Sequence, residues 1–166
     1  MAVILIGGGA RSGKSRFALE KARQIAGLRV FVATAEALDE EMGARIERHK
    51  EERSAEFKTI EAPLDLPSIV SSTMFDAMVV DCLTLWLSNI MFAHRDCDGE
   101  VDALALAARS APGTVLFVTN EVGCGIVPDN ALAREFRDRA GFLNQRIASI
   151  ADEVYVMAFG QALRVK

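Results

Sequence analysis

The sequence predicts an α/β fold in which a mostly parallel β-sheet is flanked by helices. Short apolar runs alternate with helix-compatible segments from end to end, a pattern typical of parallel strands joined by helical connections. Two closing apolar runs around Gly160 predict an antiparallel hairpin at one edge of the sheet. The chain has 166 residues, of which 51% are hydrophobic, so we expect a single domain over residues 1–166 with a sizeable core.

Each element is predicted from its own pattern. Apolar runs favour strands over residues 3–6, 30–34, 57–61, 78–81, 115–119, 154–158 and 162–165. Helical spacing of apolar residues, or charged faces with acids in the first turn, favours helices over residues 15–26, 39–53, 83–92, 101–108 and 129–150. Gly27 is a helix stop, and Asp129 is suited to cap the last helix. We expect a loop or short helix around residues 63–67 and a polar loop over residues 94–99.

The first predicted strand leads into a glycine-rich loop. Residues 8–15 read GGARSGKS and match G-x-x-x-x-G-K-S between an apolar strand and a helix. Glycines let backbone N–H groups turn toward phosphate oxygens, and the following helix directs its positive dipole end at the same anion. The pattern predicts a P-loop (RecA-like) nucleotide site made by Gly8, Gly9, Ala10, Arg11, Ser12, Gly13, Lys14 and Ser15. Lys14 is expected to reach the β- and γ-phosphates, and Ser15 to bind Mg²⁺.

Two acids follow predicted strands. Parallel sheets bind ligands at the carboxyl ends of their strands, so Thr34, Asp81 and Glu121 are expected at the same edge as the P-loop. Asp81 suits a Mg²⁺ ligand in a P-loop protein, although a strand-end acid that caps the next helix explains it as well. Glu121 is a second candidate for the metal or for an acceptor hydroxyl.

The predicted helix over residues 39–53 carries a histidine among cations. Arg45, His49 and Arg53 are spaced four residues apart and share one helix face. Neighbouring cations disfavour the protonated imidazole, and a neutral imidazole is a nucleophile that could form a bond to phosphorus. A solvated charged helix that happens to contain a histidine is the alternative, and on the residues alone it is the commoner case.

Composition excludes several classes of function. The net charge of −4 provides no overall basic field for nucleic acid, and no apolar run reaches membrane-spanning length. Cys82, Cys97 and Cys124 lack metal-type spacing, so we expect reduced thiols. Met1 leads directly into the first strand, without a targeting leader. These features predict a cytoplasmic protein.

Taken together, the motifs resemble those of a known enzyme family. GGARSGKS, RIERH, TNEVG and GIVP occur in this order, within segments 8–15, 33–35, 39–42, 45–49, 80–84, 119–123, 125–128 and 136–145. The arrangement is similar to the bifunctional adenosylcobinamide kinase/adenosylcobinamide-phosphate guanylyltransferase family of cobalamin biosynthesis. The resemblance covers nearly the whole chain. It implies phosphorylation of adenosylcobinamide by ATP or GTP, followed by transfer of GMP from GTP to adenosylcobinamide phosphate with release of pyrophosphate.

The resemblance also implies roles for individual residues. His49 falls on the histidine of the family's RIxxH motif and would carry the GMP group. The resemblance places GTP contacts, besides the P-loop, at Ala33, Thr34, Ala35, Lys50, Glu51, Glu52, Arg53, Glu61 and Asp81. The acids at positions 61 and 81 could accept from a guanine edge or hold Mg²⁺. The family is trimeric, so a homotrimer is implied.

Two departures from the family pattern stand out. Residues 93–112 form a shorter segment than usual, and Arg48 stands where some members have a second histidine. Two other classes of function remain as alternatives. A different small-molecule P-loop kinase would have no covalent intermediate, and a nucleotide-dependent switch module would have no small acceptor; neither needs the RIxxH helix or the TNEVG loop.

Overall fold

The computed structural model describes residues 1–35 and 56–166. The predicted helix over residues 39–53 lies outside them. The elements in chain order are β1 (Val3–Gly8), α1 (Lys14–Arg23), β2 (Arg29–Ala33), β3 (Lys58–Glu61), α3 (Leu66–Ser72), β4 (Ala77–Asp81), α4 (Leu83–Phe92), α5 (Cys97–Arg109), β5 (Thr114–Val118), α6 (Ala131–Ile150), β6 (Glu153–Ala158) and β7 (Gln161–Arg164).

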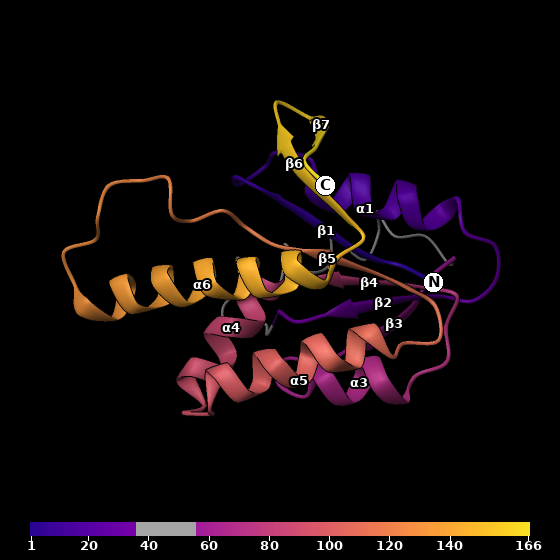
Figure 1. The fold of residues 1–166 in the computed structure, drawn as a ribbon, viewed down its shortest axis with the longest axis horizontal. Helices are drawn as coiled ribbons and strands as arrows, with labels where there is room; N and C mark the ends of the chain where they lie inside the picture. The colour runs from indigo at the N-terminus through magenta and orange to yellow at the C-terminus, as the bar shows by residue number, and fades with distance from the viewer. Residues whose placement is uncertain (36–55) are drawn as a thin grey trace.

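The described strands form one seven-stranded sheet in the order β3-β2-β4-β5-β1-β6-β7. Every neighbouring pair is parallel except β6 and β7, which pair antiparallel at the edge. In Figure 1, α1 lies above the strands, and α3, α4 and α5 lie below them. The prediction of a mostly parallel sheet with helices on both faces and a C-terminal edge hairpin is confirmed.

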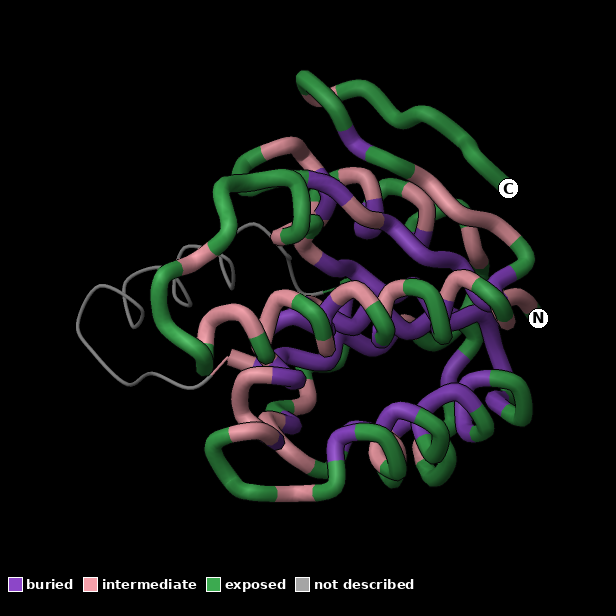
Figure 2. Tube along the Cα trace, turned by 60° about the vertical axis from the view of Figure 1, so that its left-hand side comes forward, coloured by how far each residue is buried: buried purple, intermediate pink, exposed green. Residues whose placement is uncertain are grey.

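The sheet separates two hydrophobic cores because alternate strand residues point to opposite faces. Val3 and Leu5 of β1 pack toward α3, α4, α5 and α6, in a core that contains the fully buried side chains of Trp86 and Phe117. Ile4 and Ile6 pack on the other face against α1. Figure 2 shows the buried residues running along the central strands, with the edge hairpin largely exposed. The P-loop therefore follows a strand that is buried on both sides.

Two helices differ in length from their predictions. Helix α1 ends at Arg23, short of the predicted residue 26, because the Arg29 side chain donates to the carbonyl oxygens of Ala22, Arg23 and Ile25 and satisfies the end of the helix. Helix α5 begins at Cys97 and takes in part of the predicted polar loop. Its first turn contains acids, which the helix dipole favours.

The start of α6 corrects a sequence prediction. Asp129 was expected to cap this helix, but the N-cap is Asn130, whose Oδ1 accepts a hydrogen bond of 2.7 Å from the Ala133 backbone N–H. Asparagine is as good a cap as aspartate, so local sequence does not separate the two positions. Of the two alternatives for residues 63–67, the structure has a loop followed by the short helix α3, with Pro67 in its first turn.

The described ranges contain neither a membrane-spanning helix nor a disulfide bond. No helix in residues 1–35 or 56–166 is long and apolar enough to cross a membrane. Cys82, Cys97 and Cys124 are all free, and the first two are buried. Burial, and after it the neighbouring Asp81 charge, raise the pKa of the Cys82 thiol to about 11. This thiol therefore stays protonated near pH 7 and is a packing residue.

A polar cluster joins α1 to β6. Lys21 Nζ lies 2.9 Å from Glu153 Oε2 and 3.0 Å from the Tyr155 hydroxyl, which itself donates to Glu153 at 2.7 Å. The Tyr155 hydrogen bond, and then the Lys21 ammonium, hold the pKa of Glu153 below its ordinary value. Partial burial acts to lower the pKa of Lys21, but its bonds to Tyr155 and Glu153 raise it overall. The cluster fixes the edge hairpin to the P-loop helix.

We expect Glu153→Gln to reduce the free energy of unfolding at pH 7 by about 1 kcal/mol, since it removes a charge-assisted hydrogen bond. A carboxylate with a lowered folded-state pKa stabilises the protein above its unfolded-state pKa of about 4.3, and this stability is lost as pH falls through the folded-state pKa. The variant should therefore have a shallower loss of stability in acid than the parent. Urea unfolding at pH 7 and at a series of lower pH values measures both effects.

The matched control is Glu135→Gln. Glu135 pairs with Arg139 at 2.9 Å on the exposed surface of α6, where an ion pair contributes little. The prediction is contradicted if Glu153→Gln has the same acid dependence as the parent protein.

Candidate active site

The P-loop connects β1 to α1 in a conformation that depends on glycine. Gly13 is the N-cap of α1 with φ +95°, a left-handed conformation that favours glycine. Gly8 has φ +150°, and a Cβ there would lie 2.6 Å from the Met157 carbonyl oxygen of β6. The loop can therefore turn tightly at the N-terminus of α1 while it packs against the neighbouring strand.

Lys14 is held close to this loop. Its side chain is buried, with 7% of the residue exposed, and Nζ donates to the Gly9 carbonyl at 2.5 Å and lies 3.4 Å from Ser12 Oγ. The ammonium is thus on the inner side of the loop, beside the backbone that would surround a phosphate. A positive charge and a helix N-terminus at one point make an anion site.

Two carboxylates lie beside the end of β2. Ala33 pairs in register with Glu61 on β3 and with Asp81 on β4. Register partners point to the same face of a sheet, and Ala33 belongs to the core that packs against α1. Glu61 and Asp81 therefore flank Ala33 on the face from which the P-loop helix extends. The structure brings these three predicted site residues together.

Thr34 joins the ends of β2 and β4. It is fully buried, and its hydroxyl both accepts from the Cys82 N–H and donates to the Cys82 carbonyl, at 2.8 Å in each case. Asn89 of α4 donates to the Thr34 carbonyl at 2.8 Å and to the Pro63 carbonyl at 3.0 Å. These bonds hold Ala35 and the segment after Glu61 at the carboxyl edge of the sheet. Thr34 thus positions the strand ends through buried hydrogen bonds.

The two interpretations of Asp81 separate in the structure. Helix α4 begins after Cys82, so its N-cap is Cys82 and not Asp81. Asp81 is half-buried at the end of β4, one residue before the N-cap position that the capping alternative would need. Glu121 lies beyond β5; its backbone N–H donates to the Gly8 carbonyl at 3.1 Å, and its carboxylate accepts from the Gly123 N–H at 2.6 Å. Glu121 therefore connects its loop to the P-loop.

A polar network lies behind the carboxyl edge of the sheet, and the sequence did not predict it. Thr119 Oγ1 donates to Asn144 Oδ1 at 2.7 Å and lies 3.4 Å from Thr84 Oγ1, which accepts from the Asn120 N–H at 2.8 Å. Both threonines are buried. The network connects the starts of α4 and of the loop after β5 to the middle of α6. Small polar residues next to apolar runs were its one signal in the sequence.

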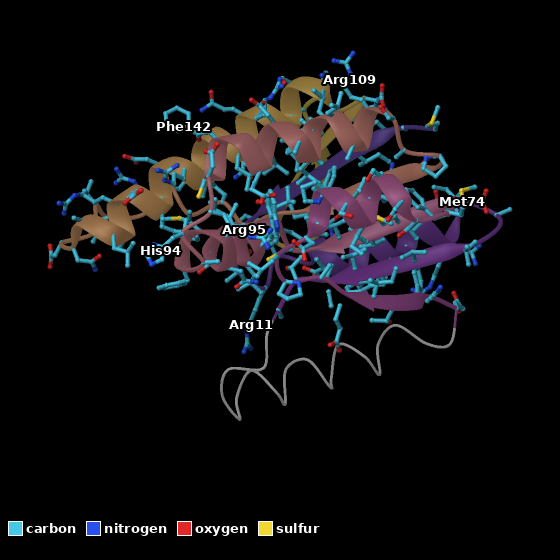
Figure 3. The ribbon with its side chains drawn as sticks, turned by 90° about the horizontal axis from the view of Figure 1, so that it is seen from below. Arg11, Met74, His94, Arg95, Arg109 and Phe142 are labelled. Carbon is cyan, nitrogen blue, oxygen red and sulfur yellow. The ribbon has the colours of Figure 1, made fainter. Side chains whose placement is uncertain are left out.

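Five predicted site residues lie outside the part of the chain that the structure describes, namely His49, Lys50, Glu51, Glu52 and Arg53. His94, by contrast, is exposed after the end of α4, and Figure 3 shows it on the opposite side of the ribbon from Met74. Arg11 projects from the P-loop away from the sheet in the same view. The described site is thus the P-loop with the carboxylate pair Glu61 and Asp81.

Solved structures share this fold at low sequence identity. The RadB recombinase matches 93% of the chain with a TM-score of 0.52 and 15% identity, over 73% of its own chain. An ATPase of a bacterial type III secretion system matches 98% of the chain with a TM-score of 0.58 and 12% identity, over 56% of its own chain. At this level of identity the likenesses show a shared α/β fold and nothing about function.

Curated relatives are much more similar. The bifunctional adenosylcobalamin biosynthesis protein CobU of Salmonella typhimurium is 40% identical over 184 residues, with 99% of each chain covered. CobP of Pseudomonas aeruginosa, which has the same description, is 42% identical over 98% of this chain and 96% of its own. CobU of Escherichia coli is 36% identical over 99% of both chains.

A family model agrees with these relatives. The model described as cobinamide kinase / cobinamide phosphate guanyltransferase matches residues 4–165, from β1 to the end of the edge hairpin. The match includes the P-loop, the carboxylate pair and the buried threonine network. The chain therefore belongs to the cobinamide kinase / cobinamide phosphate guanyltransferase family.

Proposed function

We propose that this protein phosphorylates adenosylcobinamide and then transfers GMP to adenosylcobinamide phosphate. The observation that carries the proposal is a complete P-loop, with Lys14 turned onto its inner side, at the sheet edge that also presents Glu61 and Asp81. Membership of the family supplies the acceptor. ATP or GTP is the phosphate donor in the first transfer, and GTP is the nucleotidyl donor in the second.

The kinase reaction needs the triphosphate held and its charge compensated. We propose that backbone N–H groups from Gly8 to Ser15 bind the phosphates and that Lys14 stabilises charge on the transferred group. The acceptor hydroxyl attacks the γ-phosphorus and releases its proton to solvent, the bond between the γ-phosphorus and the bridging oxygen breaks, and the nucleoside diphosphate leaves. The buried position of Lys14 supports this role, since a charge excluded from water acts more strongly on a phosphate.

The donor atoms also suit Mg²⁺. This ion takes oxygen ligands and is usually held by one or two carboxylates together with phosphates. Among the described residues, no group of three or more His, Cys, Asp or Glu could hold a metal by itself. The half-buried Asp81 and the Ser15 hydroxyl suit an ion that binds together with the nucleotide, where it would neutralise phosphate charge.

For guanylyl transfer we propose His49 as the nucleophile. The imidazole nitrogen attacks the α-phosphorus of GTP, a P–N bond forms, and pyrophosphate leaves. A phosphate oxygen of the acceptor then attacks the same phosphorus, the P–N bond breaks, and adenosylcobinamide-GDP is formed. Ala33, Thr34, Ala35, Glu61 and Asp81 would bind the nucleotide from the described edge. Four residues that directly follow the nucleophile in the sequence would contact the same GTP: Lys50, Glu51, Glu52 and Arg53.

The proposal extends to the domain, its assembly, its compartment and its partners. We propose that residues 1–166 form one P-loop domain that carries both reactions, that it assembles as a homotrimer, and that it acts in the cytoplasm. The three free cysteines support a reducing compartment. We also propose that its partners are small corrinoids, with no nucleic acid partner, since the net charge is −4.

We expect His49→Ala to abolish GMP transfer while much of the kinase activity remains, because only GMP transfer uses a covalent nucleophile. The measurement is to incubate parent and variant with Mg²⁺ and GTP labelled at the α-phosphate, denature, and count protein-bound label. The parent should form an acid-labile, base-stable adduct that the variant lacks. His94→Ala is the matched control, since His94 is exposed beyond α4. Unchanged GMP transfer by the His49 variant would exclude the proposed nucleophile.

Lys14→Ala should impair both reactions, because each needs the same polyphosphate held in place. Removal of one preorganised charge-stabilising group typically lowers kcat by about 100- to 1000-fold. Rates of γ-phosphate transfer and of GMP transfer are measured on the same preparation, with Lys58→Ala on the exposed start of β3 as control. A Lys14 variant that loses only one of the two reactions would show that they use separate phosphate sites.

Asp81→Asn should raise the Mg²⁺ concentration needed for half-maximal rate in both reactions, since an amide is a weaker ligand of a hard cation than a carboxylate. Magnesium titrations of each reaction test this expectation. Asp129→Asn, at an exposed position before α6, is the control. An unchanged magnesium requirement in the Asp81 variant would assign Asp81 to guanine binding alone.

A further inference from the structure

A cavity of about 510 Å³ on the outer side of α1 has no role in the site described above. It begins at the P-loop and runs along two turns of the helix. Its volume is in the range of small-molecule sites. Its lining residues are Arg11, Ser12, Gly13, Arg16, Leu19, Arg23 and Gly160.

The cavity adjoins the phosphate site, because Arg11, Ser12 and Gly13 of the P-loop are among its lining residues and the turn of the edge hairpin lies beside them. A Cβ on Gly13 would lie 3.5 Å from the Gly160 Cα, and one on Gly160 would lie 3.9 Å from Arg16 Nη2. The turn between β6 and β7 and the first turn of α1 are therefore in near contact. A nucleotide with its phosphates in the loop could extend its nucleoside directly into this cavity.

The chemistry of the cavity suits a purine nucleoside. Arg16 is exposed, and its ion pair with Glu20 is long, at 3.8 Å, so its guanidinium plane is available for stacking. Leu19 lines the cavity only with the small part of its side chain that the core leaves exposed. Phe159 does not line the cavity, but it is next in the chain to the lining residue Gly160 and has 101% of its surface exposed. Aromatic and guanidinium planes stack on any purine base, whereas no lining residue is an acid that would select guanine.

The cavity and the carboxylate pair lie on opposite sides of the P-loop. In the strand order β3-β2-β4-β5-β1-β6-β7, the loop follows β1, with Glu61 and Asp81 toward β3 and the cavity toward β7. A triphosphate bound across the loop can point its nucleoside either way. The two reactions attack opposite ends of the phosphate chain, the γ-phosphorus in one and the α-phosphorus in the other.

We propose that this cavity is a second nucleoside site, which binds the base and ribose of the phosphate donor during the kinase reaction. The inference rests on the proposed function. With the donor nucleoside in the cavity, the γ-phosphate lies toward the carboxylate pair. With the GTP base toward Glu61 and Asp81, as in guanylyl transfer, the phosphate chain is reversed and the α-phosphate lies at that edge. The same acceptor position then serves both transfers, and stacking in the cavity accepts ATP and GTP alike.

The test uses Phe159→Ala and Arg16→Ala in the full-length protein. Loss of one stacking plane should raise the KM for ATP and for GTP as phosphate donors by about tenfold. The KM for GTP in GMP transfer, measured with label at the α-phosphate, should stay within about twofold of the parent value. Inhibition by inorganic tripolyphosphate, which has no base, should be unchanged, showing that the P-loop is intact. Phe142→Ala on α6 is the matched control; Figure 3 places Phe142 on the opposite side of the molecule from Arg11.

Photolabelling with 8-azido-ATP and peptide mapping tests the site independently of turnover. We expect label on residues 11–23 and 154–166, and less of it in Phe159→Ala. Label confined to residues 29–35 and 58–61, an unchanged donor KM, or an equal rise of KM in both reactions would overturn the inference. A parent protein that forms the GMP adduct and phosphorylates no adenosylcobinamide would contradict the kinase half of the proposed function. In that case the label positions would still decide whether the cavity binds a nucleoside.

Discussion

Parallel pairing in register is the constraint on which the rest of this structure depends. Because β1, β2, β3, β4 and β5 run in the same direction, their carboxyl ends meet at one edge, and the chemical groups of the described site lie there on a loop, a strand end or the first turn of α1. A shift of β3 or β4 by one residue would turn Glu61 or Asp81 to the opposite face, since side chains alternate along a strand. The two hydrophobic cores oppose such a shift, because it would exchange Val79 and Val80 of β4 between the cores and turn Ile60 of β3 away from the core that it packs against.

An edge of this kind has polar backbone groups that the sheet cannot pair. Thr34 and Thr84 satisfy several of them from buried positions, and Asn89 and Asn144 do the same from the covering helices. Thr119 donates to the Asn144 side chain and so holds it in place. Buried hydrogen bonds of this type are costly to lose, because the partner left behind is desolvated and unpaired. The network therefore gives the strand ends a defined geometry, and it connects the stability of this edge to the position of the residues proposed to bind the nucleotide.

Charge is distributed unequally around the P-loop. Carboxylates lie on the side of β3 and β4, whereas Arg11, Arg16 and Arg23 line the cavity beside the hairpin, and Lys14 lies between them. A triphosphate bound at Lys14 thus has an acidic neighbourhood at one end, suited to Mg²⁺ or a guanine edge, and a cationic, partly apolar one at the other. One loop with two different surroundings is a simple way for a small protein to handle the two ends of a nucleotide.

The sequence by itself determined the α/β class, most strand and helix positions, the P-loop and the family resemblance, because these depend on local periodicity and on short motifs. The sequence predicted the ends of helices less well. At Arg23, the last carbonyl groups of the helix bind the Arg29 side chain, and at the start of α6 either Asp129 or Asn130 could have been the cap. Tertiary structure alone decided the strand order, the alignment of Glu61 and Asp81 with Ala33, the threonine network, and the meeting of Arg16 with Gly160. These features join residues that are far apart in the chain, and their positions follow from how the whole sheet packs.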